Sequence, residues 1–145
     1  MTTYPDLVLV EDNHDDIEMI KDALKDTGEK ISTLVFTDGA EAAQFFFQPD
    51  SRFRTNNMQP PKLILLDLKI PKINGLELLK RFKSDDKTRH IPVVIFTSSN
   101  AKSDRMTCYQ SGANSYLIKP LDADLFSEYI GEIIKYWVGM NENIS

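Results

Sequence analysis

The sequence has 145 residues, of which 41% are hydrophobic and 27% charged, with a formal net charge of −5. These values indicate one soluble globular domain with a normal core and exclude a disordered chain. The negative charge argues against nucleic-acid binding. The one cysteine excludes an internal disulfide and a metal site built from thiolates. No apolar run is long enough for a membrane span.

The first predicted element is a buried strand at Leu7–Val10, an unbroken apolar run. The residues before it, Met1–Asp6, lack the pattern of a signal peptide, so we expect a cytoplasmic protein. Two acids, Glu11 and Asp12, follow the strand directly. Asp15–Lys25 then carries apolar residues at helical spacing, which predicts an amphipathic helix.

A second strand and helix are predicted at Ser32–Phe36 and Ala40–Gln48, with Asp38 as a candidate N-cap. One helix cannot point all of Phe45–Phe47 inward, so one of these rings is expected to cover a loop or to face a partner. The polar stretch Pro49–Lys62 shows no periodicity and is interpreted as a surface loop. The alternative is an insertion that contacts a partner, because long unstructured loops are uncommon in compact domains.

The third predicted strand, Leu63–Leu66, is again wholly apolar and stops abruptly at Asp67. A short loop with Pro71 and Gly75 leads into an amphipathic helix, for which Asn74 is a candidate cap. A carboxylate at this position is costly to half-bury unless a cation or a hydrogen bond meets it.

The remaining elements repeat the alternation of strand and helix. Strands are predicted at Pro92–Phe96, which ends at Thr97, and at Ser115–Ile118, which ends at Lys119. A helix lies between them at Ala101–Gln110. Pro120 after the lysine indicates a fixed turn, and a cis peptide bond is one way to make it.

The last predicted helix begins at Asp122 or Asp124 and runs to about Val138, followed by a polar tail, Gly139–Ser145. One apolar stripe on it is assigned to the core, at Phe126, Ile130, Ile133 and Trp137. A second stripe widens the apolar face, at Leu125, Tyr129 and Tyr136. The second stripe either packs against the sheet as well or forms a protein interface, most simply in a two-fold homodimer.

Five strand–helix units predict an α/β fold, a doubly wound parallel sheet of five strands with five helices. The functional site of such a sheet lies beyond the carboxyl ends of the strands. Four different strands end in hydrophilic residues that would meet there, namely Glu11, Asp12, Asp67, Thr97 and Lys119.

Three carboxylates in one cleft repel each other unless a cation lies between them. Glu11, Asp12 and Asp67 offer only oxygen ligands, which favours Mg²⁺, although acids at strand ends can also be simply solvated. Asp67 can act as a nucleophile, since carboxylates form acyl phosphates. Lys119 would then neutralise one phosphoryl oxygen, and the hydroxyl of Thr97 would donate to another.

These residues resemble a known family. Glu11-Asp12, the stretch Asp67–Gly75, Thr97-Ser98 and Lys119-Pro120 together look like the receiver domain of two-component response regulators. The resemblance implies a flavodoxin-like strand order, 2-1-3-4-5. It also implies that Asp67 accepts a phosphoryl group from a sensor histidine kinase. The implied magnesium ligands are Asp12, Asp67 and the backbone carbonyl of Lys69, with Glu11 acting through water.

The same resemblance implies a signalling protein that phosphorylates and dephosphorylates itself, rather than an enzyme with a separate substrate. We expect residues 1–145 to form a single receiver domain without a fused output domain, so that output goes through protein binding. The Pro49–Lys62 insertion and the aromatic last helix look similar to single-domain regulators paired with cyanobacterial phytochrome kinases. A bacterial phytochrome is therefore one candidate for the kinase.

Tyr116 occupies the aromatic switch position of the family. The hypothesis is that Thr97 moves toward the phosphoryl group and vacates space into which Tyr116 turns, as a shift between two existing states. A simple packing role is the alternative for this tyrosine.

Three other functions compete with this prediction. Phosphatases of the haloacid-dehalogenase type also use an aspartyl phosphate, but they place a second acid two residues after the nucleophile, where this chain has Lys69. A flavin-binding electron carrier needs a phosphate-binding loop after the first strand, where Glu11 and Asp12 would repel phosphate. A receiver-like scaffold that works without phosphorylation is the third alternative.

Overall fold

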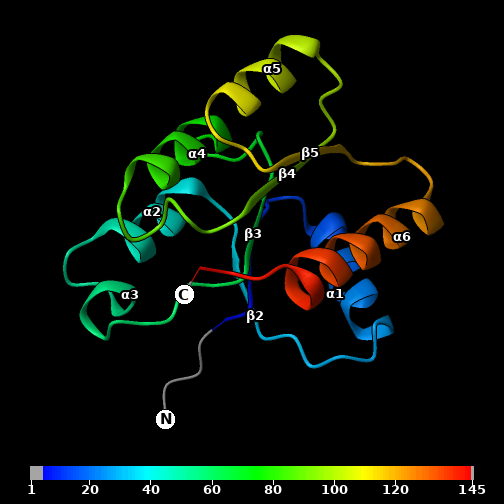
Figure 1. The fold of residues 1–145 in the computed structure, drawn as a ribbon. Coiled ribbons are helices and arrows are strands. Elements are labelled where there is room, and N and C mark those ends of the chain that lie inside the picture. The colour runs from blue at the N-terminus through cyan, green and yellow to red at the C-terminus, as the bar shows by residue number, and fades with distance from the viewer. Residues whose placement is uncertain (1–4, 145) are drawn as a thin grey trace.

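Five parallel strands form one sheet in the computed structural model, which describes residues 5–144 (Figure 1). The strands are β1 Leu7–Val10, β2 Thr33–Phe36, β3 Leu63–Leu66, β4 Val93–Thr97 and β5 Ser115–Ile118. Their order is β2-β1-β3-β4-β5, and every neighbouring pair is parallel. The predicted doubly wound, flavodoxin-like fold is confirmed. The predictions for Met1–Asp6 and for the polar tail Gly139–Ser145 include residues 1–4 and 145, which lie outside the described residues.

The helices lie on both faces of this sheet (Figure 1). They are α1 His14–Asp26, α2 Gly39–Phe47, the short α3 Arg52–Thr55, α4 Gly75–Ser84, α5 Lys102–Gln110, α6 Ala123–Ile134 and the π-helix η1 Lys135–Met140. The two predicted caps are present, since Asp38 and Asn74 each accept a hydrogen bond from a backbone N–H three residues further on. Asp122, one of the two predicted starts of the last helix, caps α6 in the same way. None of the helices in residues 5–144 combines the length and the apolar character that crossing a membrane requires.

Two cores explain why the central strands read as unbroken apolar runs. Along β1, Val8 and Val10 belong to the core under α2 and α4, while Leu7 and Leu9 belong to the core under α1 and α6. Neighbouring residues of a strand point to opposite faces, and here both faces are covered. The edge strands β2 and β5 are less buried than β1, β3 and β4.

The stretch Pro49–Lys62 is not the unstructured surface loop that its composition indicates. It contains α3, and the side chains of Phe53 and Met58 are buried in the core. Arg54 ties the segment down, because its guanidinium contacts Asp85 at 2.5 Å and donates to the carbonyl of Phe46 at 2.7 Å. Four-residue helices have no repeat for periodicity to detect, which is why the sequence gives no sign of α3.

The three consecutive phenylalanines of α2 have three different environments. Phe46 is fully buried, and Phe47 packs beside Phe82. Phe45 is half-buried and its ring lies 5.8 Å from that of Phe53 in α3. Of the two predicted roles for the outlying ring, covering the neighbouring chain segment is the one observed.

The last helix changes its winding at Ile134. It continues to Met140 as η1, where Asn141 N–H donates to the carbonyl of Tyr136 five residues earlier at 2.7 Å. The predicted core residues of α6 are buried, but Trp137 in η1 is only half-buried. Helical spacing predicts faces for α-helices only, and the wider π-turn rotates the residues that follow it.

Candidate functional site

The sheet itself positions the two central acids. Glu11 follows β1, and its backbone N–H donates to the carbonyl of Phe36 at 3.0 Å. Asp67 follows β3, and its N–H donates to the carbonyl of Val10 at 3.0 Å. The parallel hydrogen-bond ladder thus continues into both acids and fixes them at the same edge.

Glu11, Asp12 and Asp67 come together as predicted. Each offers a carboxylate oxygen, and these three oxygens lie within 4.8 Å of one another. Glu11 and Asp67 are buried, whereas Asp12 is exposed. The group is called the acidic cluster below.

Lys119 is the cation that meets the acidic cluster. Its backbone N–H donates to the carbonyl of Thr97 at 2.7 Å, which fixes its place beside the end of β4. Its ammonium, on a side chain only 9% exposed, pairs with Asp67 at 2.9 Å, with Asp16 at 2.7 Å and with Glu11. A buried ammonium requires such partners, and three carboxylates around one ammonium leave the site with excess negative charge.

The two buried acids differ in their affinity for protons. Burial raises the pKa of Glu11 to about 7, more than the contact with Lys119 lowers it. Burial acts in the same direction on Asp67, but the charge and hydrogen bond of Lys119, with the Thr97 hydroxyl, hold the pKa of Asp67 below its usual value. Burial would lower the pKa of Lys119, but its hydrogen bonds to Asp16 and Glu11 raise it. Asp67 therefore stays ionised, as a nucleophile must.

The loop after Asp67 wraps closely around it. A side chain on Gly75 would place its Cβ 2.2 Å from the carbonyl oxygen of Asp67, so only glycine fits where α4 begins. Gly75 N–H donates to the carbonyl of Leu68 at 2.9 Å, and Lys69 N–H donates to the Asp67 carboxylate at 3.4 Å. The backbone of Lys69 therefore lies beside this carboxylate, while its side chain is exposed.

Thr97 and Tyr116 are connected through one short segment. Thr97 is buried at the end of β4, and its Oγ1 accepts a hydrogen bond from Ser99 N–H at 3.4 Å. Tyr116 is turned inward, and its hydroxyl donates to the carbonyl of Ser99 at 2.9 Å.

No peptide bond in residues 5–144 is cis, so the suggested cis bond before Pro120 is wrong.

The predicted interface stripe does not form one exposed surface. Leu125 and Tyr136 are 40% and 49% exposed, but Tyr129 is half-buried against the core under α1 and α6. Other exposed apolar side chains lie on α5, β5 and the loop before α6, at Met106, Tyr109, Ile118 and Leu121. Exposed apolar side chains are therefore not confined to the last helix.

Asp16 is the site residue that the sequence did not reveal. An acid in the first turn of a helix is ordinary, since it favours the positive end of the helix dipole. Its contact with Lys119 joins residues 103 positions apart, and no local pattern contains that information.

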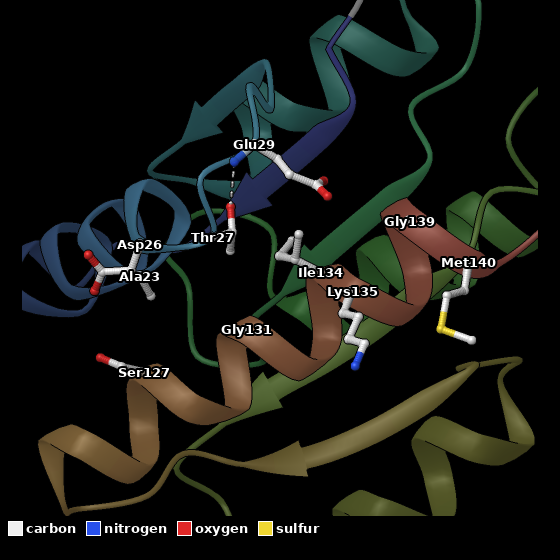
Figure 2. A pocket seen from close by; sticks show the side chains of 10 residues that line it. All are labelled: Ala23, Asp26, Thr27, Glu29, Ser127, Gly131, Ile134, Lys135, Gly139 and Met140. Carbon is white, nitrogen blue, oxygen red and sulfur yellow. Dashed lines mark hydrogen bonds between the residues drawn. The ribbon is translucent and has the colours of Figure 1, made fainter.

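A hollow away from the acidic cluster lies between α1 and α6 (Figure 2). Its volume is about 550 Å³, and its walls include Ala23, Thr27, Gly131 and Ile134. It lies at the C-terminal end of α1, whereas Asp16 lies near the N-terminal end, roughly 10 Å or more along the helix axis. None of the residues that line it belongs to the acidic cluster.

Comparisons with known proteins agree on one family. The family model described as "Response regulator receiver domain" matches residues 7–130. The chain is 34% identical over 137 residues to the probable methanogenesis regulatory protein FilR2 of Methanothrix harundinacea, covering 94% of this chain and 86% of that protein. It is also 34% identical over 133 residues to the response regulator Rcp1 of Synechocystis, covering 91% and 88%.

Two solved structures have the same fold over nearly the whole chain. The phosphorylated cyanobacterial phytochrome response regulator RcpA has a TM-score of 0.88 and 30% identity, covering 99% of this chain and all of that one. The Mn²⁺-bound form of Rcp1 has a TM-score of 0.85 and 28% identity, covering 97% and 100%.

Proposed function

The chain belongs to the response regulator receiver family, and on this basis we propose that it is a phosphorelay protein whose Asp67 accepts a phosphoryl group from a sensor histidine kinase. One observation supports this above all. The Asp67 carboxylate is kept ionised at the carboxyl edge of the sheet, beside the Lys119 ammonium and two further acids. A receiver domain is a signalling phosphoacceptor rather than an enzyme with a separate substrate.

In the proposed transfer, a carboxylate oxygen of Asp67 attacks the phosphorus of a phosphohistidine. The new O–P bond forms as the N–P bond breaks, and the imidazole leaves with the bonding electron pair. The Lys119 ammonium lies 2.9 Å from the Asp67 carboxylate, close enough to neutralise a phosphoryl oxygen there. The Thr97 hydroxyl supplies a donor for a second oxygen.

The acidic cluster fits a divalent cation, because all its donors are oxygens and its acids outnumber its one ammonium. Asp12, Asp67 and the carbonyl of Lys69 would hold Mg²⁺, with Glu11 acting through water. When bound, the cation neutralises charge on the carboxylate and on the incoming phosphoryl group. The Mn²⁺-bound structure of Rcp1 supports a divalent cation here.

The proposed partner is a histidine kinase of the phytochrome type, in view of the likeness to Rcp1 and RcpA. Such a kinase draws its phosphoryl group from ATP, which assigns the protein to the cytoplasm. The proposed switch couples Thr97 to Tyr116 through Ser99, which contacts both. If Tyr116 kept the same rotamer with and without the phosphoryl mimic beryllofluoride, this coupling would be wrong.

The core proposal is tested by incubation with acetyl phosphate and Mg²⁺, followed by intact mass spectrometry. The wild type should gain one phosphoryl group, and Asp67→Asn should gain none. Asp86→Asn, which changes an acid that is 93% exposed, is the matched control and should behave as the wild type. No adduct in the wild type, with phytochrome-type kinases also tried, would refute the proposal.

The proposed output includes a homodimer through the exposed apolar side chains of α5, β5 and the start of α6, with Leu125, Tyr129 and Tyr136 as the residues first expected to contribute. Light scattering at high micromolar concentration should show a dimer, at least with beryllofluoride. Leu125→Glu should weaken it because a charge would be buried in the interface. A monomeric mass with and without the mimic would count against this part of the proposal.

A further inference from the structure

Asp16 pairs with Lys119 but stands apart from the acidic cluster. It lies in the first turn of α1, and its carboxylate accepts a hydrogen bond from the Lys119 ammonium at 2.7 Å. Within residues 5–144, the convergent carboxylates are those of Glu11, Asp12 and Asp67, without Asp16. Asp16 therefore holds the ammonium without sharing the place where a divalent cation fits.

The other two partners of Lys119 cannot serve both charges equally well. Glu11 and Asp67 bind the ammonium and also belong to the acidic cluster. A divalent cation among these acids would take up much of their charge and repel the ammonium. The Lys119 side chain is only 9% exposed, so water does not easily replace the lost partners.

Asp16 and Lys119 are each presented by a fixed part of the backbone. Asn13 caps α1 by accepting a hydrogen bond from Asp16 N–H at 3.0 Å, and the next residue, Ile17, is buried in the core. Lys119 N–H is bound to the carbonyl of Thr97 at 2.7 Å. Groups on rigid elements keep their geometry when a neighbouring contact is lost.

We propose that Asp16 is a positioning residue that keeps the Lys119 ammonium beside Asp67 when a divalent cation occupies the acidic cluster. This inference rests on the proposed function, because it assigns Asp16 a role at the same site. Without the Asp16 carboxylate, the ammonium would lose its last full negative partner and turn toward solvent. With it, the ammonium stays where a phosphoryl oxygen on Asp67 would lie.

The test measures how fast Lys119 reacts with an amine-acetylating reagent, by peptide mass spectrometry, with and without saturating Mg²⁺. In the wild type, Lys119 should be protected under both conditions. In Asp16→Asn, it should be protected without Mg²⁺, where Glu11 and Asp67 still bind it. With Mg²⁺, its acetylation should become about ten- to a hundred-fold faster, the size expected for the loss of one charge-assisted hydrogen bond.

Two variants separate this role from a general effect of charge or folding. Asp15→Asn removes the same charge from the same turn of α1 at an exposed residue that does not pair with Lys119, and it should behave as the wild type. Asp16→Glu keeps a carboxylate and should retain most of the protection. Thermal unfolding by circular dichroism shows whether each variant is folded.

The outcomes distinguish this inference from the proposed function. Calorimetry first establishes whether each protein binds Mg²⁺. If the wild type binds none, the proposed function fails and this inference fails with it. If Asp16→Asn binds Mg²⁺ and Lys119 remains protected, or if Asp15→Asn shows the same loss of protection, only the role of Asp16 is refuted.

Discussion

The acidic cluster with Lys119 and the aromatic cluster of α2, α3 and α4 both contain buried side chains, but different forces hold them. The aromatic cluster consists of Phe45, Phe46, Phe47, Phe53 and Phe82, and the ring of Phe46 meets those of Phe53 and Phe82 edge-on at 5.0 Å. Such contacts depend on shape and burial, not on ions. The acidic cluster depends on charge balance, so a cation, a proton or a phosphoryl group can change it.

The comparison shows where a switch can be built in this fold. A close-packed aromatic cluster has one arrangement and resists change. A site with more carboxylates than ammonium groups has several states, which differ in what neutralises the excess charge. If the two regions differ in this way, substitutions in them should respond differently to Mg²⁺ and to pH, with the largest effect on the free energy of unfolding in the aromatic cluster.

The largest effect is expected for Phe46→Ala. Phe46 is fully buried at the centre of the aromatic cluster, so the free energy of unfolding should fall by about 3–5 kcal/mol. Urea unfolding measures this value, and Mg²⁺ should restore none of the loss. Phe46→Leu leaves a smaller cavity and should lower the free energy of unfolding by less. If Mg²⁺ fully restored the stability of Phe46→Ala, the aromatic cluster would not be independent of ions as proposed.

Lys119→Met should cost about 2–4 kcal/mol at pH 7, because it leaves the buried acids Glu11 and Asp67 without their cation. Here Mg²⁺ should restore a large part of the stability, since a divalent cation supplies the missing positive charge. Urea unfolding with and without Mg²⁺ measures both values. Lys21→Met, at an exposed lysine of α1, is the control, and its free energy of unfolding should change little. If Lys119→Met lost the same stability with and without Mg²⁺, this would argue against the metal site.

Glu11 should give the protein a pH dependence. Because the pKa of Glu11 in the folded protein is raised to about 7, the folded state binds this proton more tightly than the unfolded state does. The contribution of Glu11 therefore makes stability fall as the pH rises from about 4.5 to 7, by up to about 3 kcal/mol.

This pH dependence is measured by urea unfolding of the wild type and of Glu11→Gln between pH 5 and pH 8. The difference between the two proteins should change across this range without Mg²⁺ and change much less with it, because the cation favours the ionised acid. A difference that is independent of pH would show that Glu11 is ionised throughout.

The smallest effect is expected for Arg54→Met, about 1 kcal/mol, because its ion pair with Asp85 is partly solvated. The loss should be seen mainly as faster proteolysis of Pro49–Lys62. Arg52→Met is a matched control, since Arg52 and Arg54 each lie 5.9 Å from a phenylalanine ring, but Arg52 is exposed. Equal proteolysis of both variants would show that the ion pair does not hold the segment.

Much of the candidate site was predictable because strand ends are easy to recognise in this chain. Leu7–Val10 and Leu63–Leu66 are wholly apolar, and each stops at an acid. In a parallel sheet such stops lie at one edge, so the placement of Glu11 and Asp67 at the same edge follows from the parallel sheet alone. The placement of Lys119 at this edge follows from the same argument, because the predicted strand Ser115–Ile118 ends at this lysine.

Other features depended on contacts that local patterns do not describe. The burial of Phe53 and the anchoring of Arg54 come from packing against α2 and from Asp85, far along the chain. Trp137, which α-helical spacing assigns to the core, is only half-buried in the π-turns after Ile134. Periodicity reports which face a residue shares with its sequence neighbours, not what a distant segment brings to it.

The sequence by itself determined the parallel sheet and the edge where the acids and Lys119 meet, because apolar runs and their ends decide these, while the strand order came from the resemblance to receiver domains. Only the tertiary structure decided how the charges are paired. It brought Asp16 to Lys119 across 103 residues, and it buried Glu11 deeply enough to raise its pKa while that of Asp67 is lowered. Burial and distance in space set these properties, and a linear pattern contains neither.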